Sequence, residues 1–213
     1  MTSNSFAPTY PTFFGDAPTI VVHDALAGFL GAAAGGIVEY RYVDAVKLAG
    51  HSCPTVAGAF MMARAALRAL YPQPDALPER GQIRVDLRDP RDAGVTGVIA
   101  SVLGLVTGAA GDGGFRGIGG HFVRRDRLFF GQPLADGEAR FTRLDDGRSV
   151  EAALRLERVP GDPRMARAMS RSLGGDAQPE EQALFRELWQ DRVRRILVEH
   201  VDDPDLVTIV PRH

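Results

Sequence analysis

The strongest restriction on the fold is a proline at the head of a long helix-forming run. Pro54 follows Cys53 and precedes residues 55–71, which are dominated by Ala, Met, Leu and Arg. Proline is favoured at the first position of a helix, and the residues after it are strong helix formers. The pattern therefore predicts a helix over 55–71 that has a mostly apolar stripe and carries Cys53 at or next to its N-cap.

Hydrophobic periodicity indicates the remaining elements and a single α+β domain. We expect a mixed or antiparallel sheet packed by helices over residues 18–213, preceded by an N-terminal arm over 1–17. The C-terminal helix, about 179–201, should pack on this domain. Further helices are expected over 18–34, 95–106 and 164–173, and strands over 37–43, 82–87, 121–130, 139–144, 149–156 and 206–210.

Composition limits the classes of partner. The chain has 213 residues, 45% apolar and 24% charged, with 25 basic and 27 acidic side chains, so no overall field attracts nucleic acid or anionic lipid. The basic residues of 186–195 alternate with acidic ones, which is typical of a solvated helix face. His23, Asp24 and several glycines interrupt the longest apolar stretch, which argues against a membrane span. We therefore expect a cytoplasmic protein that binds neither nucleic acid nor membranes.

The single cysteine restricts the available chemistry. Cys53 alone cannot form an internal disulfide or a four-cysteine zinc site, so any thiolate chemistry uses this residue. His51 lies two positions earlier, in a frame of glycine and proline that lets both side chains turn toward one point. A helix N-terminus favours the thiolate form. The pair is predicted to hold a transition metal, whereas the structural alternative makes Cys53 a small buried side chain and His51 a cap.

A metal needs further ligands. His23 and His121 could complete a tetrahedral site of imidazole and thiolate, a set that suits zinc. Asp24 and Asp44 are acidic candidates for the same role. Each histidine taken singly is also typical of an ordinary surface or core position.

A glycine-rich stretch is the most unusual local composition. Residues 107–120 contain seven glycines in fourteen positions, which allows left-handed backbone and close approach to a ligand or a second chain. It lacks the Lys-Ser/Thr of a phosphate loop. We predict a functional or interface loop in which Gly114 and Phe115 contact a cofactor.

Two other chemistries could use the same residues. Cys-Pro at a helix start with a nearby histidine also fits heme binding, in which thiolate or imidazole ligates the iron. The pair could instead act as nucleophile and base in acyl transfer, although no oxyanion hole or orienting third residue is evident.

The segment 47–58, KLAGHSCPTVAG, resembles the FmdE family of formylmethanofuran dehydrogenase proteins, as do GQIRV at 81–85 and Thr107-Gly108. The resemblance covers roughly residues 20–210. It implies an α+β protein, often dimeric, with a metal at His51 and Cys53. The family pattern has a histidine where this chain has Ala49, and often a cysteine where it has Ala109.

These two departures imply an altered ligand set. His121 or His23 would then replace the missing ligands, or the pocket would be remodelled for heme. We expect a homodimer with the glycine-rich loop near its interface or pocket, binding zinc or, as the alternative, heme. The expected role is metal sensing or delivery, or an accessory or enzymatic role in redox or one-carbon metabolism; a role in methanogenesis is not implied.

Overall fold

A five-stranded mixed sheet forms one layer of the molecule. The computed structural model describes residues 9–175 and 177–212. The strand order is β4-β3-β5-β6-β7, and every neighbouring pair is antiparallel except β3 and β4. The strands are β3 (Ile83–Leu87), β4 (Leu128–Phe129), β5 (Ala139–Arg143), β6 (Ser149–Leu154) and β7 (Val207–Arg212).

Alternation decides which face of this sheet is apolar. Val85 on β3 pairs with Phe141 on β5, which pairs with Val150 on β6, and all three are buried on the face toward the helices. The charged side chains of Asp86, Arg140 and Glu151 occupy alternate positions on the same strands and face the other way. The predicted α+β class is therefore confirmed, with strands 82–87, 139–144 and 149–156 close to their expected bounds.

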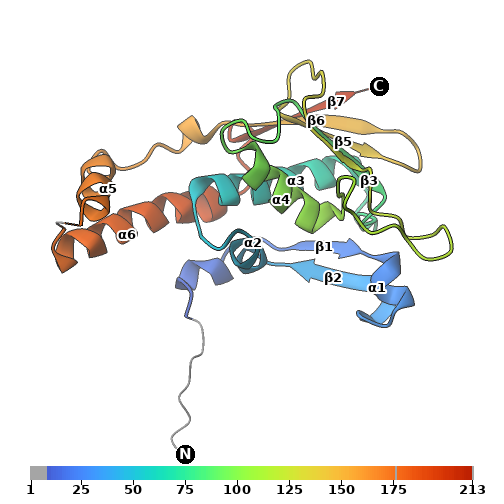
Figure 1. Ribbon diagram of the computed structural model, residues 1–213, viewed down its shortest axis with the longest axis horizontal. Helices are drawn as coiled ribbons and strands as arrows, with labels where there is room; N and C mark the ends of the chain where they lie inside the picture. The colour runs from blue at the N-terminus through green and yellow to red at the C-terminus, as the bar shows by residue number, and fades with distance from the viewer. Residues whose placement is uncertain (1–8, 176, 213) are drawn as a thin grey trace, which may run out of the picture.

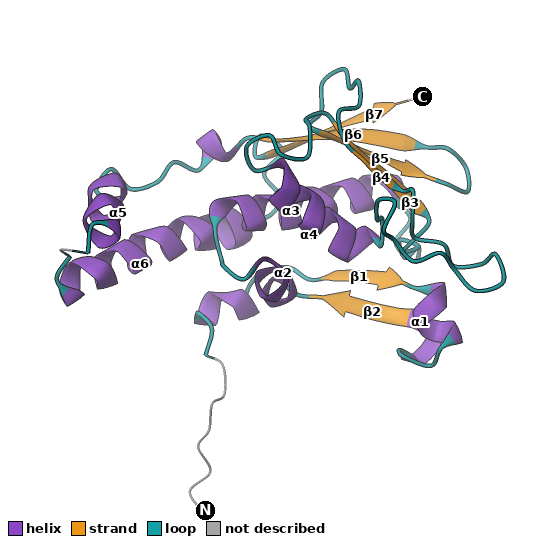
Figure 2. Ribbon diagram, viewed as in Figure 1, coloured by secondary structure: helices purple, strands orange, loops and turns teal. Residues whose placement is uncertain are grey.

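Helix α3 (Pro54–Leu70) is the centre of the core. It packs against β6 and β7 on one side and against α4 (Thr96–Thr107) and α2 (Tyr42–Ala49) on the other. Figures 1 and 2 show the resulting layers: the large sheet, the helices α3 and α4, and then α2 with a small hairpin. The helices expected over 55–71 and 95–106 are thus confirmed.

The N-terminal part differs from the prediction. In place of one helix over 18–34, the chain forms β1 (Ile20–His23) and a short α1 (Ala25–Phe29), and β1 pairs with β2 (Ile37–Tyr40). The run Ile20-Val21-Val22 is β-branched and gains a partner strand, which outweighs its helix-like spacing. The strand expected over 37–43 also ends early, because α2 begins at Tyr42.

The C-terminal helices extend away from the sheet and α3. Helix α5 (Met165–Leu173) and the beginning of α6 (Pro179–Arg194) lie far from the sheet in Figure 1, and α5 packs on α6. The expected helix over 179–201 continues past α6 as a π-helical turn, Arg195–Glu199. Its apolar side chains at Val193, Ile196 and Leu197 are buried, so this end joins the core.

The strand expected over 121–130 is reduced to the two residues of β4. Phe122 and Asp126 have positive φ angles of 61° and 55°, which a regular strand cannot contain. The glycine-rich segment instead folds back on itself: the amide of Arg124 donates to the carbonyl of Phe115 at 2.8 Å, and that of Ala110 to the carbonyl of Arg124 at 3.0 Å.

The first residues of the chain lie partly outside the structure. Of the predicted arm over 1–17, residues 1–8 are not among those described. The rest includes a 3-10 turn, Thr12–Gly15, whose Phe14 ring packs edge-on against Tyr42 with centroids 4.9 Å apart. None of the described helices is both long enough and apolar enough to span a lipid bilayer.

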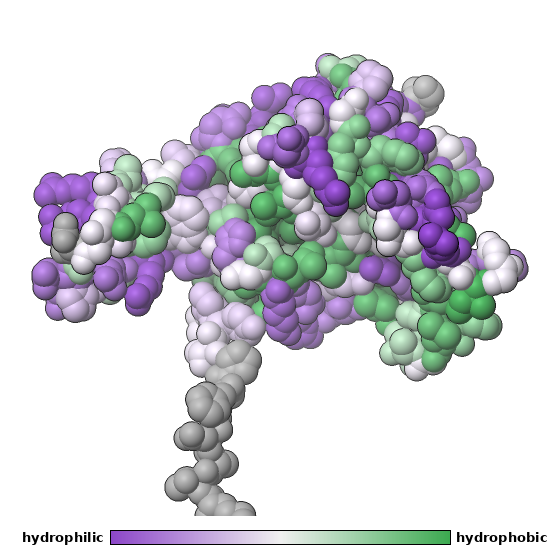
Figure 3. All heavy atoms as spheres, viewed as in Figure 1, coloured by the Kyte–Doolittle hydropathy of each residue, from purple (hydrophilic) through white to green (hydrophobic). Residues whose placement is uncertain are grey.

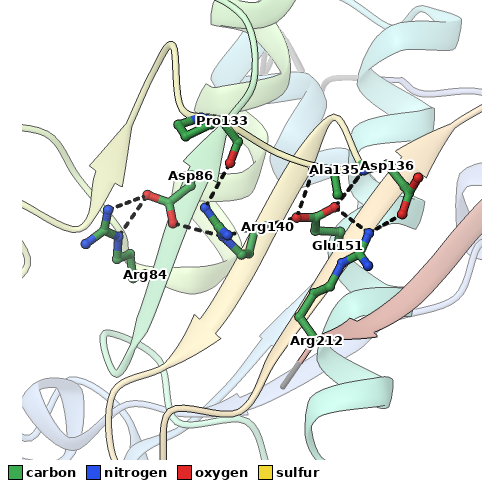
Figure 4. Close-up of polar contacts among 9 residues, drawn as sticks. Arg84, Asp86, Pro133, Ala135, Asp136, Arg140, Glu151 and Arg212 are labelled. Atoms are coloured by element: carbon green, nitrogen blue, oxygen red, sulfur yellow. Dashed lines mark hydrogen bonds and ion pairs between the residues drawn. The ribbon is translucent and has the colours of Figure 1, made fainter.

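Charged side chains cross the sheet on its other face. Arg140 on β5 lies between the carboxylates of Asp86 on β3 and Glu151 on β6, and Arg212 on β7 contacts Glu151 at 3.0 Å (Figure 4). Asp86 and Glu151 are buried. Glu151 also accepts the backbone amides of Asp136 and Gly137, which belong to the loop over this face. The carboxylate therefore holds that loop on the sheet.

We expect Glu151→Gln to lower the free energy of unfolding at neutral pH by about 3 kcal/mol, because Arg212 and Arg140 lose a buried counter-charge. Burial alone would raise the pKa of Glu151, but the amides and Arg212 lower it from 4.5 to about 2. Its stabilisation is thus present above pH 4.5 and is lost as the pH falls toward 2. Urea unfolding of both proteins across this interval should show the difference shrinking; a difference independent of pH would contradict the assignment.

Candidate functional site

Cys53 is the N-cap of α3, as its place before Pro54 predicts. Its backbone is extended (φ −150°, ψ 166°) and its Sγ accepts the amide of Val56 at 3.4 Å. The side chain is buried. The sulfur therefore lies at the N-terminal end of a long helix and accepts one of its free amides.

Ser52 is the middle residue of the motif His51-Ser52-Cys53. It anchors this segment to helix α6. Its carbonyl accepts the Trp189 indole N–H at 2.9 Å and a second, longer bond from Gln190 Nε2 at 3.4 Å. Its hydroxyl donates to Gln190 Oε1 at 3.0 Å. Helix α6 thus holds the residue between His51 and Cys53 at both its backbone and its side chain.

The Tyr42 hydroxyl completes this network. It lies 3.0 Å from the Ser52 hydroxyl. Since the Ser52 proton is used toward Gln190, Tyr42 is the donor in this contact. Burial raises the pKa of Tyr42 well above its ordinary value, partly offset by the bond to Ser52. The phenol therefore stays protonated and continues to donate at any physiological pH.

His51 lies on the surface beside this anchor. Its Nδ1 is 2.9 Å from the carbonyl of Ala49. A carbonyl only accepts, so Nδ1 carries the proton of the neutral ring and the lone pair is on Nε2. A metal-binding histidine characteristically donates its other ring N–H to a carbonyl or carboxylate in this way. The backbone of Ala49 thus orients the His51 ring.

His23 has a different environment. Its Nδ1 lies 2.5 Å from Glu79, and its Nε2 lies against Gly36, where an added Cβ would come within 2.9 Å of it. Its backbone also pairs with the 78–80 segment. These neighbours are not shared with His51 or Cys53, and the structure does not bring His23 to the motif.

The two acidic candidates have structural roles. Asp24 caps α1 and accepts Arg80 Nη1 at 2.7 Å and Arg124 Nη2 at 2.6 Å. Asp44 caps α2 through the backbone amide of Arg41 at 2.9 Å. Both carboxylates therefore accept hydrogen bonds from protein donors, and no described contact brings either of them to His51 or Cys53.

The candidates on the glycine-rich loop pack mainly within that loop. Gly114 lies so close to Ala110 and Arg125 that an added Cβ would approach each within 2.7 Å. Phe115 is exposed, and its carbonyl binds the loop's own amides. His121 is exposed in a tight turn with Ile118. Among the described residues, no hydrogen bond joins this loop to His51 or Cys53.

Within the part of the chain that the structure describes, no three His, Cys, Asp or Glu side chains come together as a metal site. Over residues 9–175 and 177–212, a single copy therefore offers His51 and Cys53 and no third ligand of these types near them. Imidazole nitrogen and thiolate sulfur are ligand types of a soft or borderline metal, but the hydrogen bonds of His51 and Cys53 go to different partners, Ala49 and Val56.

Comparisons with known proteins add no support for a metal site at His51 and Cys53. No family model matches the chain, and no curated protein matches it. The resemblance carried by residues 47–58 therefore stays a prediction.

No local sequence pattern predicts which residues hold the motif in place. Trp189 and Gln190 lie 137 and 138 residues after Ser52. A lone tryptophan beside a glutamine on a charged helix gives no local signal of a distant partner. The alternation over 37–43 predicts Tyr42 in a strand, although an aromatic residue ten positions before Ser52 lies within reach of it once α2 forms.

Proposed function

We propose that this protein binds a transition-metal ion, zinc in the first place, through His51 Nε2 and Cys53 Sγ. The observation that carries the proposal is the Nδ1 contact of His51 with the Ala49 carbonyl, which presents Nε2 as a lone-pair donor two residues from the only thiol. Imidazole nitrogen and thiolate sulfur together suit zinc better than magnesium or calcium.

The rigidity of the segment supports the same proposal. Metal sites need ligands held within narrow limits of geometry, and Ser52 is held by three side chains from two helices. A serine that only linked His51 to Cys53 would not require hydrogen bonds with the side chains of a tyrosine, a tryptophan and a glutamine. The hydrogen bonds of Ser52 thus fix the backbone that carries both proposed ligands.

A second copy of the chain is the proposed source of the remaining ligands, as the expected homodimer requires. An apolar surface is present for association: Phe29, Leu30 and Ile37 are exposed together around α1, and the Phe29 ring lies 5.1 Å from Phe122 of the glycine-rich loop. Figure 3 shows this green surface at the lower right. A patch of this kind on a folded chain is typical of an interaction site.

The same geometry favours a metal ion over heme. A heme needs a large cavity beside its ligand, but Cys53 is only 8% exposed and its Sγ already accepts a helix amide. A surface cavity of about 730 Å³ beside α3 is lined by neither His51 nor Cys53. Metal sensing, delivery or an accessory role in redox or one-carbon metabolism is the proposed context.

Cobalt titration tests the proposal directly. We expect the wild-type protein to bind Co²⁺ with a sulfur-to-cobalt charge-transfer absorption, and Zn²⁺ to displace it. Cys53→Ser should abolish this absorption while the protein stays folded, because serine is itself a good N-cap. His51→Ala, at an exposed position, should weaken binding by about tenfold to a hundredfold, in line with the loss of a metal-site group.

The control is His200→Ala, which removes a histidine already paired with Asp203 at 2.7 Å. It should bind cobalt like the wild type. One metal per two chains would indicate a site shared between copies, and one per chain a site completed by water. Unchanged metal content in folded Cys53→Ser would refute the proposal.

A further inference from the structure

A surface cavity of about 730 Å³ opens beside α3, toward its C-terminal end. It lies between the C-terminal half of α3, the beginning of β1, the proline-containing loop 72–78 and the turn 200–204. This volume is within the range of roughly 300–1,000 Å³ typical of small-molecule sites. Neither His51 nor Cys53 lines it, so it is independent of the proposed metal site.

The walls of the cavity expose apolar and polar surface in nearly equal shares, and the apolar share includes side chains of the core. Met61, Leu67 and Tyr71 come from α3 and its C-cap, and Ile20 from β1. All of them are buried and belong to the core. The prolines of the loop 72–78 restrict its backbone, so this wall is fixed before a ligand arrives.

Two arginines carry the charge at the rim. Arg64 and Arg68 are four residues apart on α3 and therefore lie on one side of the helix. Their Nη1 atoms lie 2.8 Å and 2.6 Å from the same oxygen, Asp202 Oδ1. Two guanidinium groups thus share one carboxylate, and the group of three has a net charge of +1.

Asp203 adds a second negative charge at this rim, so the charges of Arg64, Arg68, Asp202 and Asp203 sum to zero when the His200 imidazole is neutral. His200 and Asp203 pair with each other at 2.7 Å. The carboxylate of Asp202 is 61% exposed, as is Arg68 at 63%, so both can move, whereas Arg64 also donates to the Val201 carbonyl at 3.0 Å. Asp202 occupies the position that the head of an anionic ligand would take.

We propose that this cavity binds a small amphipathic carboxylate, whose head pairs with Arg68 and Arg64 and whose apolar body lies on Met61, Leu67 and the Tyr71 ring. An arginine fork matches a carboxylate in geometry and charge. The Asp202 side chain competes with the ligand head for the same guanidinium groups, so it sets the affinity of the site.

Calorimetric titration with decanoate, below its micelle-forming concentration, tests this inference. We expect saturable binding of decanoate, with decanol and decylamine binding much more weakly. Inorganic phosphate alone should also bind weakly, because it lacks the apolar body. Equal binding of decanol and decanoate would overturn the role of the arginines, and the absence of decanoate binding would overturn the site.

Variants distinguish the contribution of the charged side chains to decanoate binding from that of apolar packing. Arg68→Ala should weaken decanoate binding by about tenfold, the size of one charge-assisted hydrogen bond. Asp202→Asn should strengthen it by a similar factor, which a merely structural Asp202 would not do. Tyr71→Phe is the control: its hydroxyl is inaccessible, so binding should not change. Weaker binding by folded Asp202→Asn would refute the proposal.

Discussion

Replacing Gly81 with alanine should unfold the protein or lower its free energy of unfolding by about 4 kcal/mol or more. Gly81 has a φ of +86°, and an added Cβ would lie 1.3 Å from Arg124 Nη1 and 2.2 Å from its Cζ. The guanidinium cannot move aside cheaply, because its Nη2 is bonded to Asp24 in the core. The new methyl group would therefore break that ion pair as well as strain the backbone.

The matched control is Gly120→Ala in the glycine-rich loop. Its φ of +83° is nearly the same, but an added Cβ would meet nothing within 4 Å. It should cost only the strain of a left-handed alanine, about 1–2 kcal/mol. Chemical denaturation of the two variants thus separates the steric effect from the backbone effect, and equal losses would contradict the placement of Arg124.

The sequence predicted those elements whose signals are local. The helix 55–71 follows from Pro54 and an unbroken run of helix formers, and the hairpin 139–156 from alternation around a turn of Asp and Gly. Cys53 as N-cap follows from the same proline. In each case the residues that decide the structure are neighbours in the chain.

The predictions that fail concern residues whose structure depends on partners far away in the sequence. Residues 20–23 have helical spacing, yet they become a strand because β2 lies on one side and the 78–80 segment on the other. Asp24 is a candidate metal ligand by residue type, but its partners Arg80 and Arg124 come 56 and 100 residues later. Periodicity carries no information about such contacts.

Asp24→Asn is the second substitution for which we expect a large loss of stability. Asp24→Asn should lower the free energy of unfolding by about 3–5 kcal/mol, because Arg124 and Arg80 lose their shared buried counter-charge. The Nε and Nη1 atoms of Arg124 are buried without hydrogen-bond partners among the described residues. The bond from Nη2 to Asp24 is thus the main compensation for burying this guanidinium.

The pH dependence follows from the same contacts. Burial alone would raise the pKa of Asp24, but the bonds from Arg80 and the Ala27 amide and the charges of both arginines together lower it below 3.8. Its contribution to stability is therefore complete above that pH and is lost as the pH falls further. Asp24→Asn should lack this part of the acid transition.

Asp44→Asn is the control, since Asp44 also accepts a backbone amide at a helix start, but its one ion pair within 4 Å among the described residues is with Lys47, at 3.9 Å. It should cost no more than about 1 kcal/mol. Adding Arg124→Leu to Asp24→Asn should recover part of the lost stability, because the unpaired buried charge is then removed. If the double variant is less stable than Asp24→Asn by the full cost of Arg124→Leu alone, the two residues are not coupled and the buried pair does not organise this part of the core.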